Sequence, residues 1–150
     1  MVLMETLAFT YIGNELLTDS TKSIYEKISN IMSYTTPEVD HIYYELDIKT
    51  TVEIIGQFIK DLDANDNLKK TSIKNSIILS VKKIYETLSD IDSLMNKINN
   101  DVIEHNNKWF ASWRTPIYIS KLDDLKILKN HLDARFDALD KVIRISNNLN

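Results

Sequence analysis

The sequence predicts an all-α protein, a three- or four-helix antiparallel bundle in which one long helix carries a heptad repeat. Three observations predict this class. Gly and Pro occur only twice each in 150 residues, too few for the many turns of a sandwich or barrel. Hydrophobic residues make up 43% and charged residues 27%, which suits one globular core. Apolar residues also recur at alternating spacings of four and three, which is the repeat of helices that pack together. The length of 150 residues predicts a single domain over 1–150, less regular at 1–13 and 147–150.

The N-terminal segment is predicted to be helical from residue 18 to residue 33, with one apolar face formed by Ile24, Ile28 and Ile31. Residues 1–17 fit two patterns. Leu7, Phe9 and Tyr11 alternate with polar or small residues, which is the period of a strand. Leu3, Leu7 and Tyr11 fit a helical face equally well, so the sequence leaves this segment open.

A second helix begins at Thr36-Pro37-Glu38, which combines a hydroxyl cap, a proline at the first position and an early acid. Its apolar repeat loses phase around residues 47–51. We interpret the slip as a stutter or kink within one helix, in preference to two short helices. The polar run 63–67 ends the element.

The long helix is predicted over about 68–112. Its seam alternates four- and three-residue spacings without interruption, through Ile77, Val81, Ile84, Leu88, Ile91, Met95, Ile98 and Val102, and His105 and Trp109 continue it. A helix of that length spans roughly 65–70 Å, too long for the other helices to cover. We therefore expect either a break near 99–100 or 106–107, or a homodimer that uses the seam as its interface.

Pro116 separates the long helix from the last one. The β-branched run 117–119 is a candidate to pair with 7–11 as a short β element. The last helix has an a/d ladder with Lys129 as its polar interruption, formed by Leu122, Leu125, Leu132, Phe136, Leu139 and Ile143. Ser120 and Asp123 resemble a capping box at its start, and the tail 146–150 is expected to fray.

The strongest candidate for partner binding is an aromatic and basic stretch between the last two helices, formed by Trp109, Phe110, Trp113, Arg114 and Tyr118. Trp, Tyr and Arg dominate binding hot spots because they bury much area and keep a polar handle. The competing interpretation is that these rings plug the end of the bundle.

A metal site is the weaker alternative. Glu38-x-x-His41 has the spacing found in carboxylate-bridged helical bundles, and Glu45 follows on the same face. The second such motif that this class of site requires is missing from the chain. We favour a helix-terminus role for Glu38 and a surface position for His41 and His131, with His105 as a structural seam residue.

Charge argues against general nucleic-acid binding. The chain has 18 basic and 22 acidic residues, a net charge of −4, and residues 1–60 hold four of the basic and nine of the acidic ones. A nucleic-acid-associated accessory role is kept as a further alternative.

The function predicted from sequence is a non-enzymatic helical scaffold or adaptor that binds a protein partner and self-associates. The sequence contains no phosphate-binding loop, nucleophile elbow or H-E-x-x-H motif, so we expect no catalysis and no cofactor. It also shows no signal peptide or membrane span, which predicts a cytoplasmic protein. The bias toward Ile, Asn, Lys, Asp and Tyr indicates an AT-rich coding sequence, as in a large DNA virus, a low-GC bacterium or a protist. A small viral protein acting in a host cell fits this composition.

Overall fold

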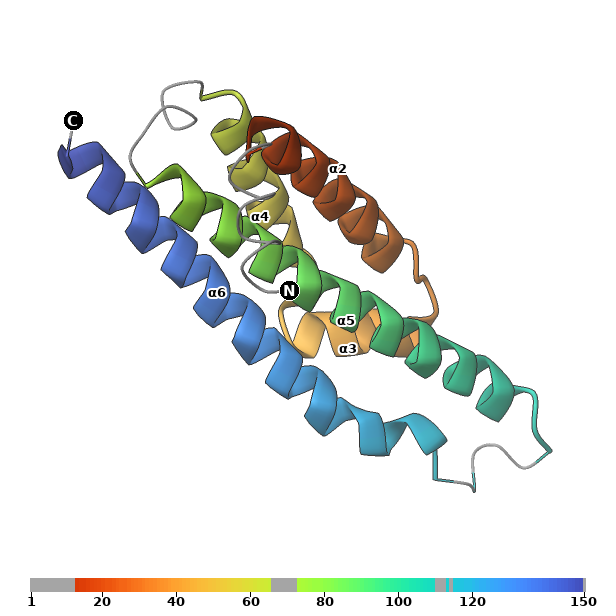
Figure 1. Cartoon of the computed structure of the whole chain (residues 1–150). Helices are drawn as coiled ribbons and strands as arrows, with labels where there is room; N and C mark the ends of the chain where they lie inside the picture. Colours follow the sequence, from red (N-terminus) through yellow and green to blue (C-terminus); the bar gives the residue numbers. More distant parts are fainter. Residues whose placement is uncertain (1–12, 66–72, 110–112, 114, 150) are drawn as a thin grey trace, which may run out of the picture.

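The computed structural model describes residues 13–65, 73–109, 113 and 115–149, and this part of the chain is almost entirely helical (Figure 1). Its elements are α2 (Gly13–Met32), α3 (Pro37–Glu45), α4 (Ile48–Asp63), α5 (Lys74–Asn106), the short 3-10 helix η3 (Ile117–Lys121) and α6 (Leu122–Leu149). The described residues include no strand, so the all-α prediction is confirmed. Residues 7–11, one half of the candidate β element, lie outside the described part.

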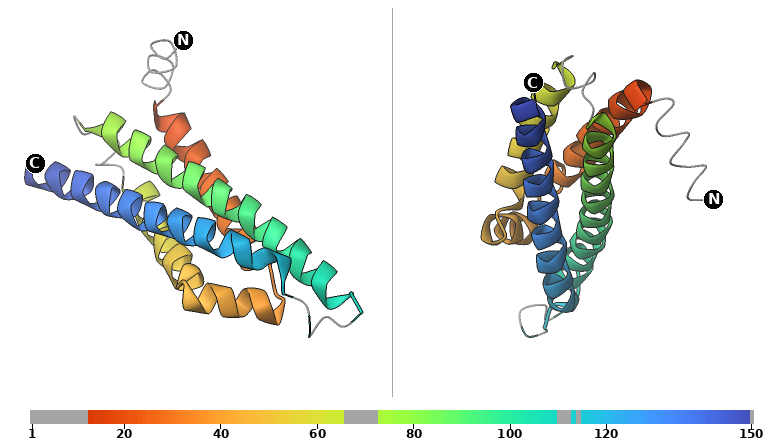
Figure 2. Two further views of the ribbon diagram at one scale, coloured as in Figure 1. Left: turned by 90° about the horizontal axis from the view of Figure 1, so that it is seen from below. Right: turned by 60° about the vertical axis from the view of Figure 1, so that its left-hand side comes forward.

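Helices α2, α4, α5 and α6 form the bundle, and α3 crosses one of its ends (Figures 1 and 2). Helix α5 contacts α2 on one side and α6 on the other, whereas α4 contacts α2 and α6. Helices α5 and α6 are antiparallel, as predicted (Figure 1). The α2–α5 pair is parallel instead: Asn30 contacts Asp92, and Thr36, farther along the chain, contacts Asn99. The purely antiparallel arrangement is therefore wrong for this pair.

The seam of α5 is buried within its own chain. All eight seam residues from Ile77 to Val102 are at most 2% exposed, and they belong to the core cluster that also includes Ile24, Ile55 and Leu132. Helices α2 and α6 flank α5 and supply most of this cover. The physical reason for the predicted dimer, an apolar seam without an intramolecular partner, is thus removed, and homodimerisation itself stays a prediction.

Helix α5 is shorter than predicted. It is continuous through Asn99 and Asn100 but ends at Asn106, followed by a turn in which Lys108 donates a backbone hydrogen bond to the His105 carbonyl at 3.1 Å. Asparagine has a poor helix propensity, which favours an end at Asn106 and Asn107, although the pair Asn99 and Asn100 lies within the helix. The alternative of a break near 106–107 is thus confirmed, the extension to 112 is wrong at 107–109, and Trp109 leaves the seam: it is 83% exposed.

The chain turns sharply between α3 and α4, where the apolar repeat loses phase. Thr36 caps α3 as predicted, accepting a hydrogen bond from the Val39 N–H at 3.4 Å. Helix α3 ends at Glu45, and Asp47 adopts a left-handed conformation with φ 53° before α4 begins. The preferred interpretation of one kinked helix is therefore wrong, because a left-handed residue cannot continue a right-handed helix.

Residues 117–119 form part of η3 rather than a strand, so this half of the candidate β element is wrong. Pro116 is extended, and the chain then closes a local hydrogen bond from the Ile119 N–H to the Pro116 carbonyl at 3.4 Å. The predicted capping box does not form, because α6 follows η3 directly and the Ser120 hydroxyl donates to the Ile117 carbonyl. Helix α6 also continues to Leu149, with Ser146 only 1% exposed, so the predicted fraying from 146 is wrong.

Gly56 allows α2 and α4 to approach closely. An ideal Cβ at this position would lie 3.3 Å from Cδ1 of Ile28, the movable end of a partly buried side chain. We expect Gly56→Ala to raise the free energy of unfolding by about 0.5–1 kcal/mol, because alanine is the better helix former and Ile28 can move slightly. Urea denaturation measures the change. A loss of stability would show that the contact between the two helices cannot adjust.

Candidate protein-interaction surfaces

Helices α5 and α6 are connected at one end of the bundle (Figure 1), and several large apolar side chains near this connection are exposed. Trp109 and Trp113 are 83% and 82% exposed, although tryptophan usually buries most of its large ring. Their exposure follows from the early end of α5, which places both outside the helical seam. Three isoleucines on either side of them in sequence are roughly half exposed, so we define the tip surface as Ile103, Trp109, Trp113, Ile117 and Ile119.

The base of the tip surface is held in place by polar contacts. The Glu38 carboxylate accepts a hydrogen bond from the Asn106 amide at 3.1 Å, which joins α3 to the end of α5. Lys121 pairs with Asp101, which joins η3 to α5. Tyr118 packs against the core, and its burial, together with the negative charge of Glu38, raises the pKa of its phenol. These contacts hold the end of α5 and η3, the two elements that carry Ile103, Ile117 and Ile119.

The predicted interaction residues differ in how exposed they are in the structure. Trp109 and Trp113 are exposed as an interaction site requires, whereas Tyr118 lies partly buried at the base. Phe110 and Arg114 lie outside the described residues. The sequence analysis missed Ile103, Ile117 and Ile119. Ile103 could have been identified from the sequence, because it is an apolar residue that lies off the heptad seam of α5 and for which the repeat predicts no apolar contact.

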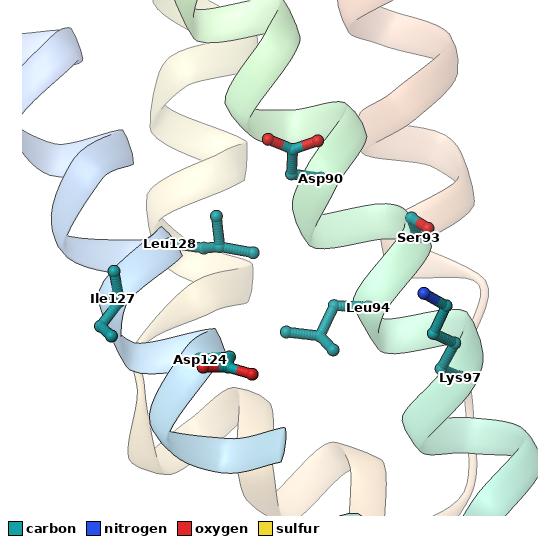
Figure 3. Close-up of a pocket in the computed structure, with 7 residues that line it drawn as sticks. All are labelled: Asp90, Ser93, Leu94, Lys97, Asp124, Ile127 and Leu128. Atoms are coloured by element: carbon teal, nitrogen blue, oxygen red, sulfur yellow. The ribbon is translucent and has the colours of Figure 1, made fainter.

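A second candidate surface is a groove between α5 and α6, with a volume of about 420 Å³ (Figure 3). Leu94 and Leu128 lie between the two helices and form its apolar floor, and both are only partly buried. Ile127 stands at the α6 edge and is 52% exposed. The other lining residues are polar or charged: Asp90, Ser93 and Lys97 from α5, and Asp124 from α6. We call this set the α5–α6 groove.

The metal-binding alternative is not supported by the arrangement of its residues. His41 and Glu45 are both well exposed, with Nε2 of His41 3.9 Å from Oε1 of Glu45, whereas Glu38 turns to Asn106. Across the described ranges, no three His, Asp or Glu side chains come together in a way that could hold a metal ion. Glu38, His41 and Glu45 therefore do not form the predicted ligand set. His131 is exposed and His105 is buried, as expected for surface and seam positions.

A buried polar network joins α2 to α5 around Asp92, which is 9% exposed. Its carboxylate accepts hydrogen bonds from the Tyr34 hydroxyl at 2.9 Å and the Asn30 amide at 3.4 Å, and Nζ of Lys27 lies 3.7 Å away. Burial and the bond to Asp92 raise the pKa of Tyr34 to about 12. The phenol thus stays a neutral donor at physiological pH, and both carboxylate oxygens are occupied. This arrangement is that of a structural network that links α2 and the residues after it to α5.

These features define the class of the protein as an all-α helical bundle with two exposed apolar surfaces. The chain is similar to a mimivirus protein from Acanthamoeba polyphaga mimivirus, described as uncharacterized protein L717. The two are 26% identical over 144 residues, in an alignment that covers 81% of this chain and 70% of the relative.

No family model matches the sequence, and no solved structure matches the fold. None of the helices in the described part combines the length and the apolarity that crossing a bilayer demands.

Proposed function

We propose that the protein is a non-enzymatic scaffold or adaptor module that binds a protein partner through the tip surface. The observation that carries this proposal is the exposure of two tryptophans, each above 80%, at one end of an otherwise well-packed bundle. Exposed apolar patches with aromatic anchors are typical of protein-binding surfaces. Each exposed ring can bury a large area against a partner.

Charge favours a protein partner over nucleic acid. The chain carries a net charge of −4, and the lysines nearest the tip are already engaged: Lys108 with Glu104 at 3.3 Å, and Lys121 with Asp101. Stacking of bases on tryptophan needs a positive groove to hold the phosphates. Among the described residues around the tip, these two lysines therefore offer little free positive charge for that purpose.

The similarity to a mimivirus protein supports a viral setting for this proposal. Together with the composition of the sequence, it favours a small viral protein that acts in the cytoplasm of its host cell. The partner of such a module is a host protein or another viral protein.

The test compares the wild type with the double variant Trp109→Ala/Trp113→Ala. Because both rings are exposed, we expect the free energy of unfolding to change by less than about 1 kcal/mol. The immobilised proteins are incubated with Acanthamoeba lysate, and retained proteins are quantified by mass spectrometry. Proteins bound by the wild type should fall at least tenfold with the double variant. Leu79→Ala, which removes a 53% exposed residue of α5 outside the tip surface, is the matched control and should retain them.

The proposal is wrong if the tip variant retains the same proteins as the wild type. Light scattering of both proteins over a concentration range tests the predicted homodimer in the same experiment. A mass near twice that of the chain in the wild type and a monomer in the tip variant would make a second copy the partner of this surface.

A further inference from the structure

We propose that the α5–α6 groove binds an amphipathic helix of a protein partner, one that carries an aliphatic anchor with lysine or arginine on either side. This site is separate from the tip surface and does not depend on the function proposed for it. Three properties of the groove support the proposal: its apolar floor, the position of its carboxylates and its shape.

The floor fits an aliphatic side chain. Leu94 and Leu128 approach each other across the groove, and Ile127 extends the apolar surface to the α6 edge (Figure 3). Each of these side chains keeps part of its surface in contact with solvent. An aliphatic residue of a partner helix that enters between the leucines would remove this surface from water, which is the mode by which helices dock into grooves.

The carboxylates lie toward opposite ends of the leucine pair. Asp90 precedes Leu94 by one turn on α5, and Asp124 precedes Leu128 by one turn on α6, a rise of about 6 Å in each case. Because the two helices are antiparallel, Asp90 and Asp124 bracket the floor from its two ends (Figure 3). Both are exposed, and within the described residues neither forms an ion pair.

Among the described residues that line the groove, the one cation is Lys97, which lies at the border. Lys97, like Ser93, is on the α5 edge away from α6, whereas both carboxylates flank the leucines (Figure 3). The charge next to the floor is therefore negative. A helix with basic residues about one turn before and after its aliphatic anchor complements both the floor and its ends.

The shape favours a helix over a small molecule. The groove runs between two long, nearly antiparallel helices and is open to solvent, whereas sites for small molecules enclose most of the ligand. A third helix laid along the two completes a layer of the kind from which helical bundles are built.

The experiment selects binders from a phage-displayed library of 20-residue helical peptides with one randomised face, using the full-length protein as the target. We expect enriched peptides to carry Leu, Ile or Met with Lys or Arg about one turn away on both sides. The best peptide is synthesised, and its affinity is measured by fluorescence anisotropy. Raising the salt concentration from 50 to 500 mM should weaken binding several-fold, because charge pairs contribute to it.

Variants then locate the site. Asp90→Asn/Asp124→Asn should weaken binding at least tenfold, as should Ile127→Ser, and all three positions are exposed enough to leave the fold intact. Asp123→Asn/Asp137→Asn is the matched control: it removes two exposed carboxylates of α6 that do not line the groove, and it should bind within twofold of the wild type. Amide chemical shifts should change around residues 90–97 and 124–128.

Three results would overturn the proposal. One is a selection that yields no binder or only peptides without basic residues. Another is binding that survives the groove variants, or shift changes that centre on the tip surface. The third is a wild-type dimer that dissociates on Ile127→Ser, which would assign the groove to a second copy of the chain. The groove variants leave Trp109 and Trp113 in place, so the function proposed for the tip surface is tested separately by the double tryptophan variant.

Discussion

Ile91→Asp is expected to unfold the protein or to lower its free energy of unfolding by more than about 4 kcal/mol. Ile91 is fully buried at the middle of the α5 seam, in the core formed with α2 and α6. The substitution removes a large apolar side chain and places an unpaired carboxylate among apolar neighbours, and either effect alone costs a substantial part of the stability of a small domain. Circular dichroism during urea denaturation measures the loss.

The matched control for this prediction is Leu79→Asp, on the same helix but 53% exposed. It should change the free energy of unfolding by less than about 1 kcal/mol. If Ile91→Asp does not accumulate as a folded protein, Ile91→Val provides the graded measurement, with an expected loss of about 0.5–1.5 kcal/mol. Equal effects of Ile91→Asp and Leu79→Asp would contradict the assignment of the seam to the core.

Asp47→Val is expected to lower the free energy of unfolding by about 2 kcal/mol, whereas Asp47→Gly should stay within about 1 kcal/mol of the wild type. Asp47 has φ 53° at the turn between α3 and α4, in the left-handed region that β-branched residues avoid most strongly. Glycine enters this region freely but gains freedom in the unfolded chain, so its two effects oppose each other. The Asp47 side chain makes no capping hydrogen bond to α4, and its loss removes none.

Comparing the two variants isolates the backbone effect, because both delete the same carboxylate. The glycine variant should be more stable than the valine variant by about 2 kcal/mol in thermal or urea unfolding. Equal stabilities would mean that Asp47 leaves the left-handed conformation at little cost, and that α3 and α4 form one continuous helix in solution.

If the proposed scaffold role is correct, the bundle has two exposed surfaces with which to bind partners. The tip surface presents aromatic rings at one end, and the α5–α6 groove presents an aliphatic floor between two carboxylates along the side. Their chemistry differs, so they would recognise different partners. A module that holds two partners at once would need no catalytic residues of its own.

The seam of α5 shows what a local sequence pattern can predict and what it cannot. The repeat from Ile77 to Val102 correctly predicted a buried stripe on a continuous helix, because burial of every third or fourth residue follows from helix geometry alone. The same repeat did not reveal what covers the stripe. Judged by length alone, the other helices could not cover it, which left a helix break or a dimer as the alternatives, whereas in the structure α2 and α6 lie along both sides of α5.

Of the two candidate sites, one was predicted in part from the sequence and the other was not. Trp109 and Trp113 were identified from the sequence by their residue type and by their position in the segment before Pro116, where the helical pattern breaks. The groove could not be predicted from the sequence, because Asp90 and Asp124 are 34 positions apart. Only the antiparallel packing of α5 and α6 brings them to the two ends of one leucine pair.

The sequence by itself determined the helical class, the buried face of α5, the start of α3 at Thr36 and the end of α4 near Asp63, since propensity, periodicity and capping act within a few residues. The tertiary structure decided which helices are neighbours and in which direction they run. It also decided that the phase slip at Asp47 is a turn between two helices, and that 117–119 form a 3-10 helix. These outcomes depend on contacts between distant residues, whose free energies no local pattern contains.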